Sequence, residues 1–325
     1  MRTANGHATP LTMNILVIGG GVIGLTTALV LHEKAHTVTV VAKEWAPHIV
    51  SSVAAAIWHP YQVAHPNATE WATVTAHRLT ALYDIPHAGI RPVIGCEYHR
   101  HAAPVPDWAG ALRYHEPIPA AELPPVEGIV AGYRFEVALI ETPVYMQWLR
   151  DQVEVAGIPL QTAIITTLDE IPSAYEVIVN CTGLGAMTLV GDNSMYPIRG
   201  QIIKVEPGYV DRFLFDEEHP LQPTYIIPRT DGTILGGTAI LQDWDMAIRD
   251  DTTDTILDYA RTLHPALQNA PILDILVGLR PGRQQVRLEQ ELHHGRPLIH
   301  NYGHGGAGYT LSWGCAEAVA QLVNG

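Results

Sequence analysis

The order of apolar and polar positions predicts a strand, a helix and a second strand at the start of the chain. Residues 14–18 are a short run that favours a strand, and residues 25–34 place apolar side chains at helical spacing. Residues 36–41 then alternate with the period of two that is typical of a strand. A β-turn-α-β unit of this kind is typical of α/β proteins with a parallel sheet.

The same patterns predict further elements along the chain. Apolar residues at helical spacing predict helices at 70–83, 142–157, 256–263 and 309–323. Apolar runs predict strands at 177–183, 202–205, 225–227 and 233–235. Asp231 and Gly232 predict a hairpin turn between the last two strands. The small residues between 51 and 61 permit a close approach of the backbone to a ligand, and Pro60 ends the helix-like part of that stretch.

One uncharged stretch, at 13–31, approaches the length of a membrane span. Glycines occur in its middle, however, and it divides into the strand, turn and helix described above. The polar residues 1–12 lack the apolar core and the cleavage site of a secretory signal. The sequence therefore predicts no membrane association and a cytoplasmic protein with a frayed N-terminal tail.

Composition limits the class of protein further. The chain has 325 residues, which at roughly 150 residues per domain indicates about two domains. Its net charge of −14 disfavours nucleic acid as a partner, because an acidic surface repels phosphates. The three cysteines, Cys96, Cys181 and Cys315, are far apart and form neither a disulfide framework nor a metal-binding pair. A reducing compartment fits this usage.

The turn after the first strand, residues 19–24, has the Gly-x-Gly-x-x-Gly pattern of dinucleotide-binding folds. One glycine makes the tight turn, one lets a pyrophosphate approach the backbone, and one lets the helix pack on the strand. The helix N-terminus offers free N–H groups and a partial positive charge to the phosphates. Glu44 follows at about the distance of a ribose-binding acid. The motif predicts a dinucleotide without distinguishing NAD from FAD.

A zinc motif overlaps this unit. His32-Glu33-Lys34-Ala35-His36 matches the His-Glu-x-x-His pattern, which needs both imidazoles on one helix face. The helix is expected to end at His36, because residues 37–41 are already a strand. We therefore predict no metal site.

A glycine-dense loop precedes the last helix. Gly305, Gly306 and Gly308 offer a second row of backbone N–H groups, and Thr310 adds a hydroxyl. Two interpretations remain open, a second contact to the cofactor or a simple entry turn of the helix.

A set of short motifs occurs in order along nearly the whole chain from Met13. They are residues 17–25, Val53-Ala54-Ala55 with Trp58 and Pro60-Tyr61, residues 179–183, Arg199-Gly200-Gln201, residues 225–228, residues 278–281, residues 287–289 and residues 300–306. Together they resemble the D-amino acid oxidase family of FAD enzymes. The last motif, His-Asn-Tyr-Gly-His-Gly-Gly, is the most specific of the set.

The resemblance implies FAD and not NAD as the cofactor. It also implies oxidative deamination, in which a neutral D-amino acid becomes an imino acid that water converts to a keto acid and ammonia. Hydride passes from the substrate Cα to flavin N5 without an obligate general base, and O2 then reoxidises the flavin to give hydrogen peroxide. The positions expected to contact FAD are Gly19, Gly20, Gly21, Val22, Ile23, Gly24, Lys43, Glu44, Ser51, Ser52, Ala55, Ala56, Ile57, Ile165, Gly305, Gly306, Gly308, Tyr309 and Thr310.

Three residues match catalytic positions of the family. Arg280 matches the arginine that binds the substrate carboxylate, a group that suits the guanidinium fork; a surface ion pair is the alternative. Tyr225 matches a tyrosine whose hydroxyl meets the same carboxylate, with a buried sheet tyrosine as the alternative. The carbonyl of Gly306 matches the acceptor for the substrate amine, and His59 stands where mammalian members have a glutamine near the substrate. Two nearby arginines have other matches and are not assigned to substrate: Arg283 and Arg287.

The chain departs from the family pattern in three places. Leu221 replaces a second active-site tyrosine of mammalian members, so the lid and the side-chain specificity stay open. Lys43 and Glu44 have the microbial order, and ribose binding falls to either of them. Ala307 replaces a mammalian tyrosine and leaves more room near the flavin.

D-aspartate oxidases share most of these motifs and need extra cations for the second carboxylate. Arg229 offers such a cation, but microbial members with neutral substrates also have arginine there. Neutral D-amino acids are therefore the first expectation, and a D-aspartate oxidase or a glycine/sarcosine-type flavin oxidase is the alternative. The expected partners are a small D-amino acid and O2. Many relatives are dimers, so a homodimer stays open.

For the architecture we expect an α/β protein, α+β overall, with a Rossmann-like FAD-binding domain. A substrate domain with a mixed or antiparallel sheet is inserted into it. The FAD-binding domain is expected at 13–60, 143–196 and 270–325, and the substrate domain at 61–142 and 197–269.

Overall fold

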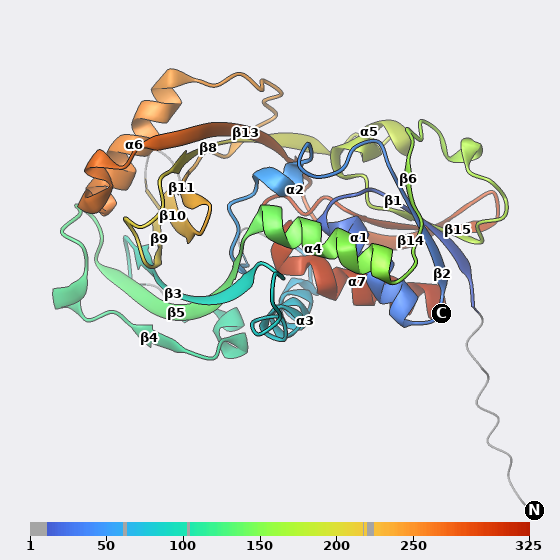
Figure 1. Cartoon of the computed structure of the whole chain (residues 1–325), viewed down its shortest axis with the longest axis horizontal. Coiled ribbons are helices and arrows are strands. Elements are labelled where there is room, and N and C mark those ends of the chain that lie inside the picture. Colours follow the sequence, from blue (N-terminus) through green and yellow to red (C-terminus); the bar gives the residue numbers. More distant parts are fainter. Residues whose placement is uncertain (1–11, 61–63, 103–104, 217, 220–223) are drawn as a thin grey trace, which may run out of the picture.

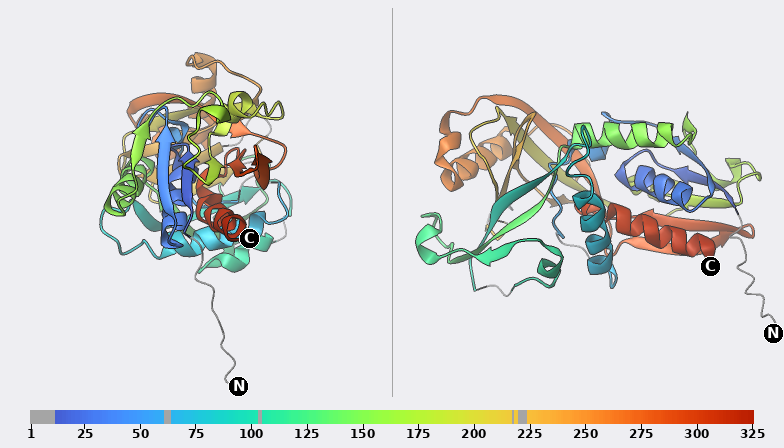
Figure 2. Two further views of the ribbon diagram at one scale, coloured as in Figure 1. Left: turned by 90° about the vertical axis from the view of Figure 1, so that its right-hand side faces the viewer. Right: turned by 60° about the horizontal axis from the view of Figure 1, so that its bottom comes forward.

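Two sheets form the framework of the protein. The computed structural model describes residues 12–60, 64–102, 105–216, 218–219 and 224–325. One sheet has six strands and the other nine, and they lie side by side along the long axis in Figure 1. The second view in Figure 2 shows helix α3 where the two halves meet, and helix α7 running from there along the half with the six-stranded sheet.

The described residues form the following elements. The strands are β1 (Asn14–Ile18), β2 (Thr37–Ala42), β3 (Ile90–His99), β4 (His115–Pro117), β5 (Ala131–Ile140), β6 (Leu160–Thr162), β7 (Val177–Asn180), β8 (Tyr196–Val205), β9 (Phe213–Asp216), β10 (Thr224–Arg229), β11 (Gly232–Gly236), β12 (Ile240–Leu241), β13 (Ile272–Gly282), β14 (Arg287–His293) and β15 (Arg296–Tyr302). The α-helices are α1 (Val22–Glu33), α2 (Val50–Val53), α3 (Ala68–Thr80), α4 (Thr142–Val155), α5 (Ala186–Leu189), α6 (Asp250–Leu263) and α7 (Gly308–Asn324).

The six-stranded sheet has the order β14-β15-β7-β1-β2-β6, and only the pairing of β14 with β15 is antiparallel. Its central strands are almost wholly buried, because both faces of a parallel sheet are covered. Helices α1, α4 and α7 cover one face (Figure 1), and apolar residues of the segment 163–190 cover the other. The carboxyl ends of β1, β2 and β7 therefore meet at one edge, where α/β sheets bind ligands.

The nine-stranded sheet runs β12-β8-β11-β10-β9-β3-β5-β4, with β13 also paired to β8. Side chains alternate between its two faces, as the strand period of two requires. One face packs against α6 through Ile256 and Leu263, together with Leu235 of the sheet. The other face carries Phe213 and Phe215, which join the core that contains α1 and α7. This second face therefore points toward the parallel sheet.

Most predicted elements are confirmed, although several boundaries differ. The Asp231-Gly232 turn closes a hairpin in which Arg229 pairs with Gly232. The last helix, predicted at 309–323, is α7. Helix α6 begins at Asp250, six positions earlier than the apolar pattern predicts, and acidic residues in its first turn favour a helix N-terminus. The helix-like stretch before Pro60 is only the single turn α2.

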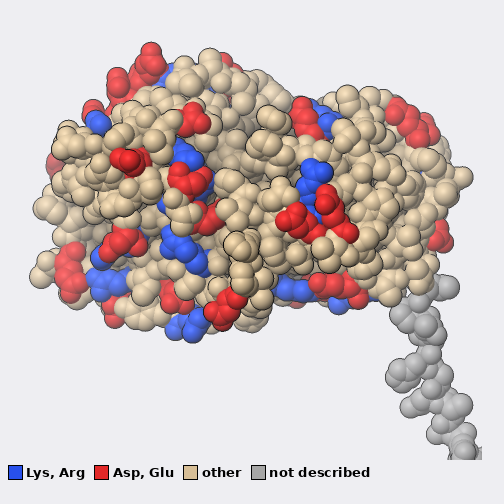
Figure 3. Space-filling view, viewed as in Figure 1, with Lys and Arg blue, Asp and Glu red and all other residues tan. Residues whose placement is uncertain are grey.

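The predicted domain division stays a prediction. Strand β13 falls in the range 270–325 expected for the FAD-binding domain, yet it pairs along its length with β8 of the nine-stranded sheet. Tyr61, Leu221 and most of the polar tail lie outside the described residues. Among the residues that the structure covers, none of the helices combines the length and apolar character needed to span a bilayer. On the face drawn in Figure 3, acidic and basic side chains lie in small mixed groups.

Candidate active site

The turn between β1 and α1 requires glycine at its first and last positions. Gly19 has a φ of +134°, and a Cβ there would overlap the Cys181 carbonyl. A Cβ on Gly24 would overlap the Gly19 carbonyl, so only glycine lets α1 pack this closely on the turn. At Gly21 a Cβ would lie 3.0 Å from the Ser51 hydroxyl, which is a crowded contact but not an overlap with the backbone.

The N-terminus of α1 lies at this turn. Gly21 precedes the helix and provides no capping side chain. The amide of Val22 donates to the Ser51 hydroxyl at 3.1 Å, which places α2 beside the helix end. Backbone N–H groups and the helix dipole make such an end suitable for a pyrophosphate. This arrangement fits the dinucleotide that the glycine pattern predicts.

The N-terminus of α7 lies beside that of α1. A Cβ on Gly308 would be 3.8 Å from the Val22 side chain, and the Tyr309 hydroxyl donates to the Ser51 carbonyl at 2.6 Å. Thr310 and His59 exchange two hydrogen bonds, one from the Thr310 hydroxyl to the His59 carbonyl and one from the His59 amide to the hydroxyl. Residues 19–24, 51–59 and 305–310 thus meet in one place, which favours a second cofactor contact over a mere entry turn.

The remaining predicted cofactor positions surround this place at different depths. Lys43 and Glu44 follow β2 and are both exposed. Their charged groups lie 3.8 Å apart as an ion pair, and none of their contacts favours one of them over the other as the residue that binds the ribose. Ile57 is buried and bridges to Leu139, so its side chain packs in the core. Ile165 packs against the opposite face of the parallel sheet. The last group lies in α2 and directly after it and is half-buried: Ser52, Ala55 and Ala56.

Arg280 lies on β13, at the part of the strand that faces the glycine-dense loop. Its guanidinium lies on Gly200, where a Cβ would overlap it, and donates to the Thr238 carbonyl at 2.9 Å. Its side chain forms no ion pair with any carboxylate of the described residues. The next residue along, Pro281, accepts a hydrogen bond from the Gly305 amide at 2.9 Å. A half-buried, unneutralised guanidinium therefore lies beside the loop that carries the exposed Gly306.

Tyr225 contacts the same chain segment as Arg280, residues 236–238. Its ring lies over Gly236 and Gly237, where side chains would overlap or crowd it. The next residue is Thr238, whose carbonyl accepts from Arg280. Tyr225 and Arg280 thus both contact residues 236–238.

His59 is almost fully buried on the same side of the nine-stranded sheet. Its ring lies among three aromatic rings, at 5.2 Å from Trp108 and from Phe215 and at 6.3 Å from Phe135. Its Nε2 lies 3.5 Å from a carboxylate oxygen of Glu97 on β3. Burial raises the pKa of Glu97, but the hydrogen bond to His59 and the charges of His59 and His99 outweigh it and lower the pKa. Glu97 is not among the residues predicted from the sequence, because it belongs to no motif; it lies two residues before His99 on the same strand.

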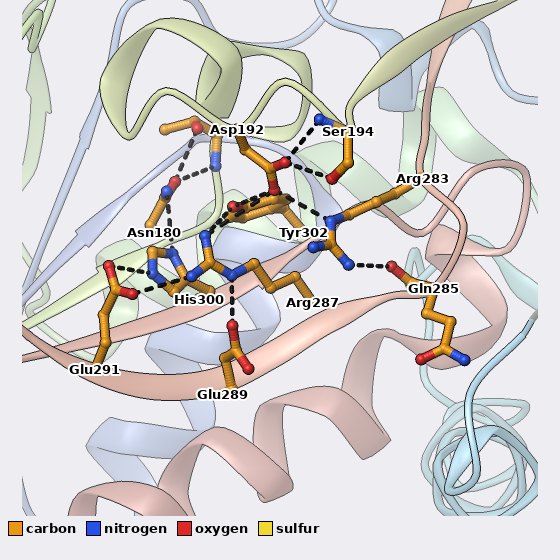
Figure 4. A network of polar contacts seen from close by, with 11 residues as sticks. Asn180, Asp192, Ser194, Arg283, Gln285, Arg287, Glu289, Glu291, His300 and Tyr302 are labelled. Carbon is orange, nitrogen blue, oxygen red and sulfur yellow. Dashed lines mark hydrogen bonds and ion pairs between the residues drawn. The ribbon is translucent and has the colours of Figure 1, made fainter.

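The arginines that follow Arg280 are engaged elsewhere (Figure 4). Arg283 donates to Asp192 at 3.1 Å, while Arg287 donates to Glu289, to Glu291 and to the Tyr302 hydroxyl. Burial of Asp192 raises its pKa, but bonds from Ser194, Tyr302 and Arg283 hold it well below its usual range. Burial is the main cause that raises the pKa of Tyr302 to about 12. This network (Asp192, Arg283, Arg287, Glu289, Glu291 and Tyr302) leaves neither arginine for a substrate.

Arg229 is neutralised as well. It is 5% exposed, and its guanidinium donates to both carboxylate oxygens of Asp231 at 2.9 and 2.7 Å. It also donates to the Thr142 hydroxyl at 2.8 Å and to the Ala54 carbonyl at 3.2 Å. Its donors hold the cofactor-side backbone in place rather than extending toward a second substrate carboxylate.

Two histidines of the motifs are buried. His36 lies just before β2, after α1 has ended at Glu33, and accepts a hydrogen bond from the Met13 amide, so His32 and His36 do not share one helix face. His304, in the most specific motif, is buried, and burial lowers its pKa to about 3. Both residues therefore serve packing in the described structure.

The comparison with protein families gives one match over nearly the whole chain. The family described as FAD dependent oxidoreductase (DAO) matches residues 14–322. A D-amino-acid oxidase of Rubrobacter xylanophilus is 42% identical over 312 residues, which cover 95% of each chain. A D-amino-acid oxidase of Streptomyces coelicolor is 36% identical over 95% of this chain and 96% of its own. Human D-aspartate oxidase is 32% identical over 96% of this chain and 95% of its own.

Solved structures of low sequence identity share the fold. A glycine oxidase from Bacillus cereus has a TM-score of 0.76 at 19% identity and covers 96% of this chain and 95% of its own. An L-proline dehydrogenase from P. horikoshii has a TM-score of 0.78 at 16% identity and covers 97% of this chain and 94% of its own. The predicted fold class is thereby confirmed.

Proposed function

The chain belongs to the DAO family of FAD dependent oxidoreductases, and from this premise we propose that it oxidises neutral D-amino acids to 2-oxo acids with release of ammonia and hydrogen peroxide. FAD is its cofactor. The observation that carries the substrate assignment is Arg280, a half-buried guanidinium without a carboxylate partner among the described residues, beside Tyr225 and the loop at 305–310.

The residues at the sheet edge fit FAD. The glycine turn, the uncapped N-terminus of α1 and the adjoining start of α7 provide backbone N–H groups where a pyrophosphate needs donors. At Gly19 and Gly24 a side chain would overlap neighbouring backbone carbonyls, so only glycine allows the turn and helix to take this arrangement. When bound, the flavin supplies a hydride acceptor that O2 can reoxidise. Lys43 and Glu44 are both candidates for the ribose.

The protein's own contribution is to hold the substrate in one orientation. The guanidinium of Arg280 has two parallel donors for a carboxylate, and the Tyr225 hydroxyl adds a third. The carbonyl of Gly306 is the proposed acceptor for the amine at the other end of the substrate. Binding at both ends fixes the direction of the Cα–H bond, and such orientation is a large part of what an enzyme provides. The imino acid that forms is then hydrolysed by water.

Neutral substrates are favoured over acidic ones because of Arg229. A second carboxylate needs a cation that is not already neutralised, and Arg229 is paired with Asp231. The relationship to a D-aspartate oxidase keeps acidic D-amino acids as the second candidate. A glycine/sarcosine-type oxidase is the further alternative, supported at the level of fold by a glycine oxidase.

A substrate panel tests the proposal. Purified protein should be yellow, and D-alanine, D-valine and D-methionine should generate peroxide while their L-enantiomers do not. Equal or higher rates with D-aspartate, or with glycine and sarcosine, would select the corresponding alternative. A colourless protein that releases no flavin on denaturation would contradict the FAD site itself.

We also propose a cellular compartment and an oligomeric state for the protein. The three cysteines are free in the described structure, which suits a reducing compartment such as the cytoplasm. A homodimer is the proposed assembly, and light scattering of the purified holoprotein tests it. A mass of one chain in solution would contradict the dimer.

A further inference from the structure

Three side chains of the kinds that bind transition metals meet at the tip of the hairpin formed by β14 and β15. Asp169 lies in a short 3-10 turn, Leu168–Glu170, while His293 ends β14 and His294 follows it in the turn to β15. Nε2 of His293 lies 3.0 Å, and Nε2 of His294 lies 3.3 Å, from the same carboxylate oxygen of Asp169. One ligand atom from each residue lies within 4.8 Å of the other two. We call these three residues the His–His–Asp cluster.

The spacing of these atoms fits a tetrahedral metal ion. In a zinc site with bonds of roughly 2.0–2.1 Å, neighbouring ligand atoms lie about 3.3 Å apart. Both nitrogen–oxygen distances in the cluster are close to this value. Two imidazole nitrogens and one carboxylate oxygen, with a fourth position left for water, are a donor set that suits Zn²⁺. Ca²⁺ and Mg²⁺ prefer oxygen ligands, so the two imidazoles disfavour them.

Contacts outside the cluster fix the two segments that carry it. Arg296 pairs with His293 across the hairpin and donates to the Pro172 carbonyl at 3.0 Å. Leu168, in the same turn as the carboxylate, is buried in one apolar cluster with Leu298 of β15. The turn and the hairpin are therefore held together without help from the three ligands. Such preorganisation lowers the cost of ordering ligands when an ion binds.

The cluster lies away from the proposed cofactor site. Strand β15 is parallel to β7, with Leu298 paired to Ile178, and His294 comes just before β15 begins. The cluster therefore lies at the amino end of these strands, whereas the cofactor is expected at their carboxyl ends. An ion bound here would join two segments of the protein and would not touch substrate or flavin.

A simpler interpretation is a pair of hydrogen bonds from two imidazoles to one carboxylate. The side chains of Asp169 and His294 are 71% and 79% exposed, and that of His293 is 24% exposed. Exposed pairs of this kind contribute little to stability. The same exposure lets an ion enter from the solvent, and the net charge of −14 attracts cations. Only a metal site requires all three side chains at once, and this requirement can be tested.

We propose that the His–His–Asp cluster binds one Zn²⁺ ion through Nε2 of each histidine and a carboxylate oxygen of Asp169, with water as the fourth ligand. Each Nε2 must be free of its proton before it can bind the ion, so binding weakens as the pH falls. The bound ion connects the segment 168–175 to the hairpin and stabilises this edge of the six-stranded sheet. The proposal goes beyond the proposed function and does not depend on it.

Isothermal titration calorimetry with ZnCl2 tests the site on the tag-free holoprotein, after treatment with EDTA and dialysis at pH 7.5. We expect one Zn²⁺ ion per chain with a micromolar dissociation constant, and much weaker binding at pH 5.5. At a Zn²⁺ concentration a hundredfold above that constant, the melting temperature should rise by about 4 °C. Mg²⁺ at the same concentration should leave it unchanged.

Two variants remove one ligand each. Asp169→Asn keeps the shape of the side chain and removes its charge. His294→Asn removes an imidazole at a residue with a φ of +51°, and asparagine is favoured in such two-residue turns, so the hairpin should be retained. Each variant should bind Zn²⁺ at least tenfold more weakly and lose the rise in melting temperature. His32→Asn is the matched control, an exposed histidine of the His-Glu-x-x-His pattern in the last turn of α1. It should bind Zn²⁺ as the wild type does.

The outcomes separate this site from the rest of the protein. A wild type that binds no Zn²⁺, or two ligand variants that bind it with the affinity and stoichiometry of the wild type, would overturn the proposal. Loss of binding in His32→Asn alone would place the ion at the helix end and overturn it as well. Melting temperatures without Zn²⁺ check that each variant is folded, and if one ligand variant is not, the other decides. Absence of D-amino acid oxidation with Zn²⁺ binding intact would contradict only the proposed function.

Discussion

Arg280 differs from Arg283 and Arg287, which are close to it in sequence, in whether a carboxylate pairs with its guanidinium. Arg280 lies on β13 against Gly200 and donates only to a backbone carbonyl, Thr238. Arg283 and Arg287 follow directly and are held by Asp192, Glu289 and Glu291. A paired guanidinium must give up its carboxylate before it can bind another, whereas an unpaired one has its donors available. The difference favours Arg280 as the proposed substrate-binding arginine, while Arg283 and Arg287 stabilise the turn beside it.

Removing the unpaired guanidinium should have the largest effect. For Arg280→Ala we expect kcat/KM for D-alanine to fall about 10³-fold, roughly 4 kcal/mol, because a substrate carboxylate loses its bidentate partner. The melting temperature of the holoprotein should stay within about 2 °C, since only one hydrogen bond to Thr238 is lost.

Arg283→Ala is the matched control, because it removes the same kind of side chain from the paired group. It should lower the melting temperature and leave kcat/KM within about threefold. Equal losses of kcat/KM in the two variants would remove the distinction between the two groups.

Removing the carboxylate that pairs with Arg283 should have the second largest effect, on stability. Asp192→Asn removes the charge that Arg283 faces, and we expect the free energy of unfolding to fall by about 2 kcal/mol at pH 7, discounted for the partial exposure of Arg283. Because the pKa of Asp192 is lowered in the folded protein, its stabilisation is present above the unfolded pKa of about 4 and is lost as the pH falls below it.

Denaturant titrations from pH 7 down to about pH 2 measure this difference. The gap between wild type and Asp192→Asn should narrow as the pH falls below about 4. A gap that does not change with pH would show that the loss comes from packing and not from the charge.

Tyr225→Phe should have a smaller effect on activity. Phenylalanine keeps the ring over Gly236 and Gly237 and removes only the hydroxyl. We expect kcat/KM for D-alanine to fall about tenfold, as for one hydrogen bond to a charged group, with the flavin content unchanged. Steady-state kinetics measure it, and an unaffected kcat/KM would exclude the hydroxyl from carboxylate binding.

Releasing an arginine from its partner should change specificity least. Asp231→Asn weakens the neutralisation of Arg229, but Thr142 and Ala54 still hold the guanidinium. The ratio of D-aspartate to D-alanine oxidation should rise by no more than about threefold. A much larger rise would mean that Arg229 reaches the substrate, and acidic D-amino acids would then become the first candidate.

Much of the fold was predictable from the sequence because its signals are local. The alternation at 36–41, the glycines at 19–24 and the Asp231-Gly232 turn each fix the backbone nearby, and the structure contains the corresponding strand, turn and hairpin. The start of α6 was missed because its first turn is polar and has no apolar spacing. The path of β13 was missed because a strand's partner is not encoded in its own pattern.

The candidate site was predictable only in part. The resemblance to a family marked Arg280, Tyr225, Gly306 and His59, but Glu97 was not found. Glu97 lies in a strand without a motif, and what distinguishes it is the contact of its carboxylate with His59, a residue distant in sequence. Likewise, Asp192 carries no motif, and its role appears only where a loop brings it to Arg283.

The sequence by itself predicted a dinucleotide site and most helices and strands, because backbone preferences and short motifs act over a few residues. Through the family resemblance it also predicted FAD and named candidate substrate-binding side chains. Only the tertiary structure decided which of those side chains has its charge available. Charge is neutralised through space, and the carboxylates that pair Arg229, Arg283 and Arg287 reach them through turns and strand pairing. Arg280 has no such partner among the described residues, and its guanidinium lies over Gly200 and donates to the Thr238 carbonyl.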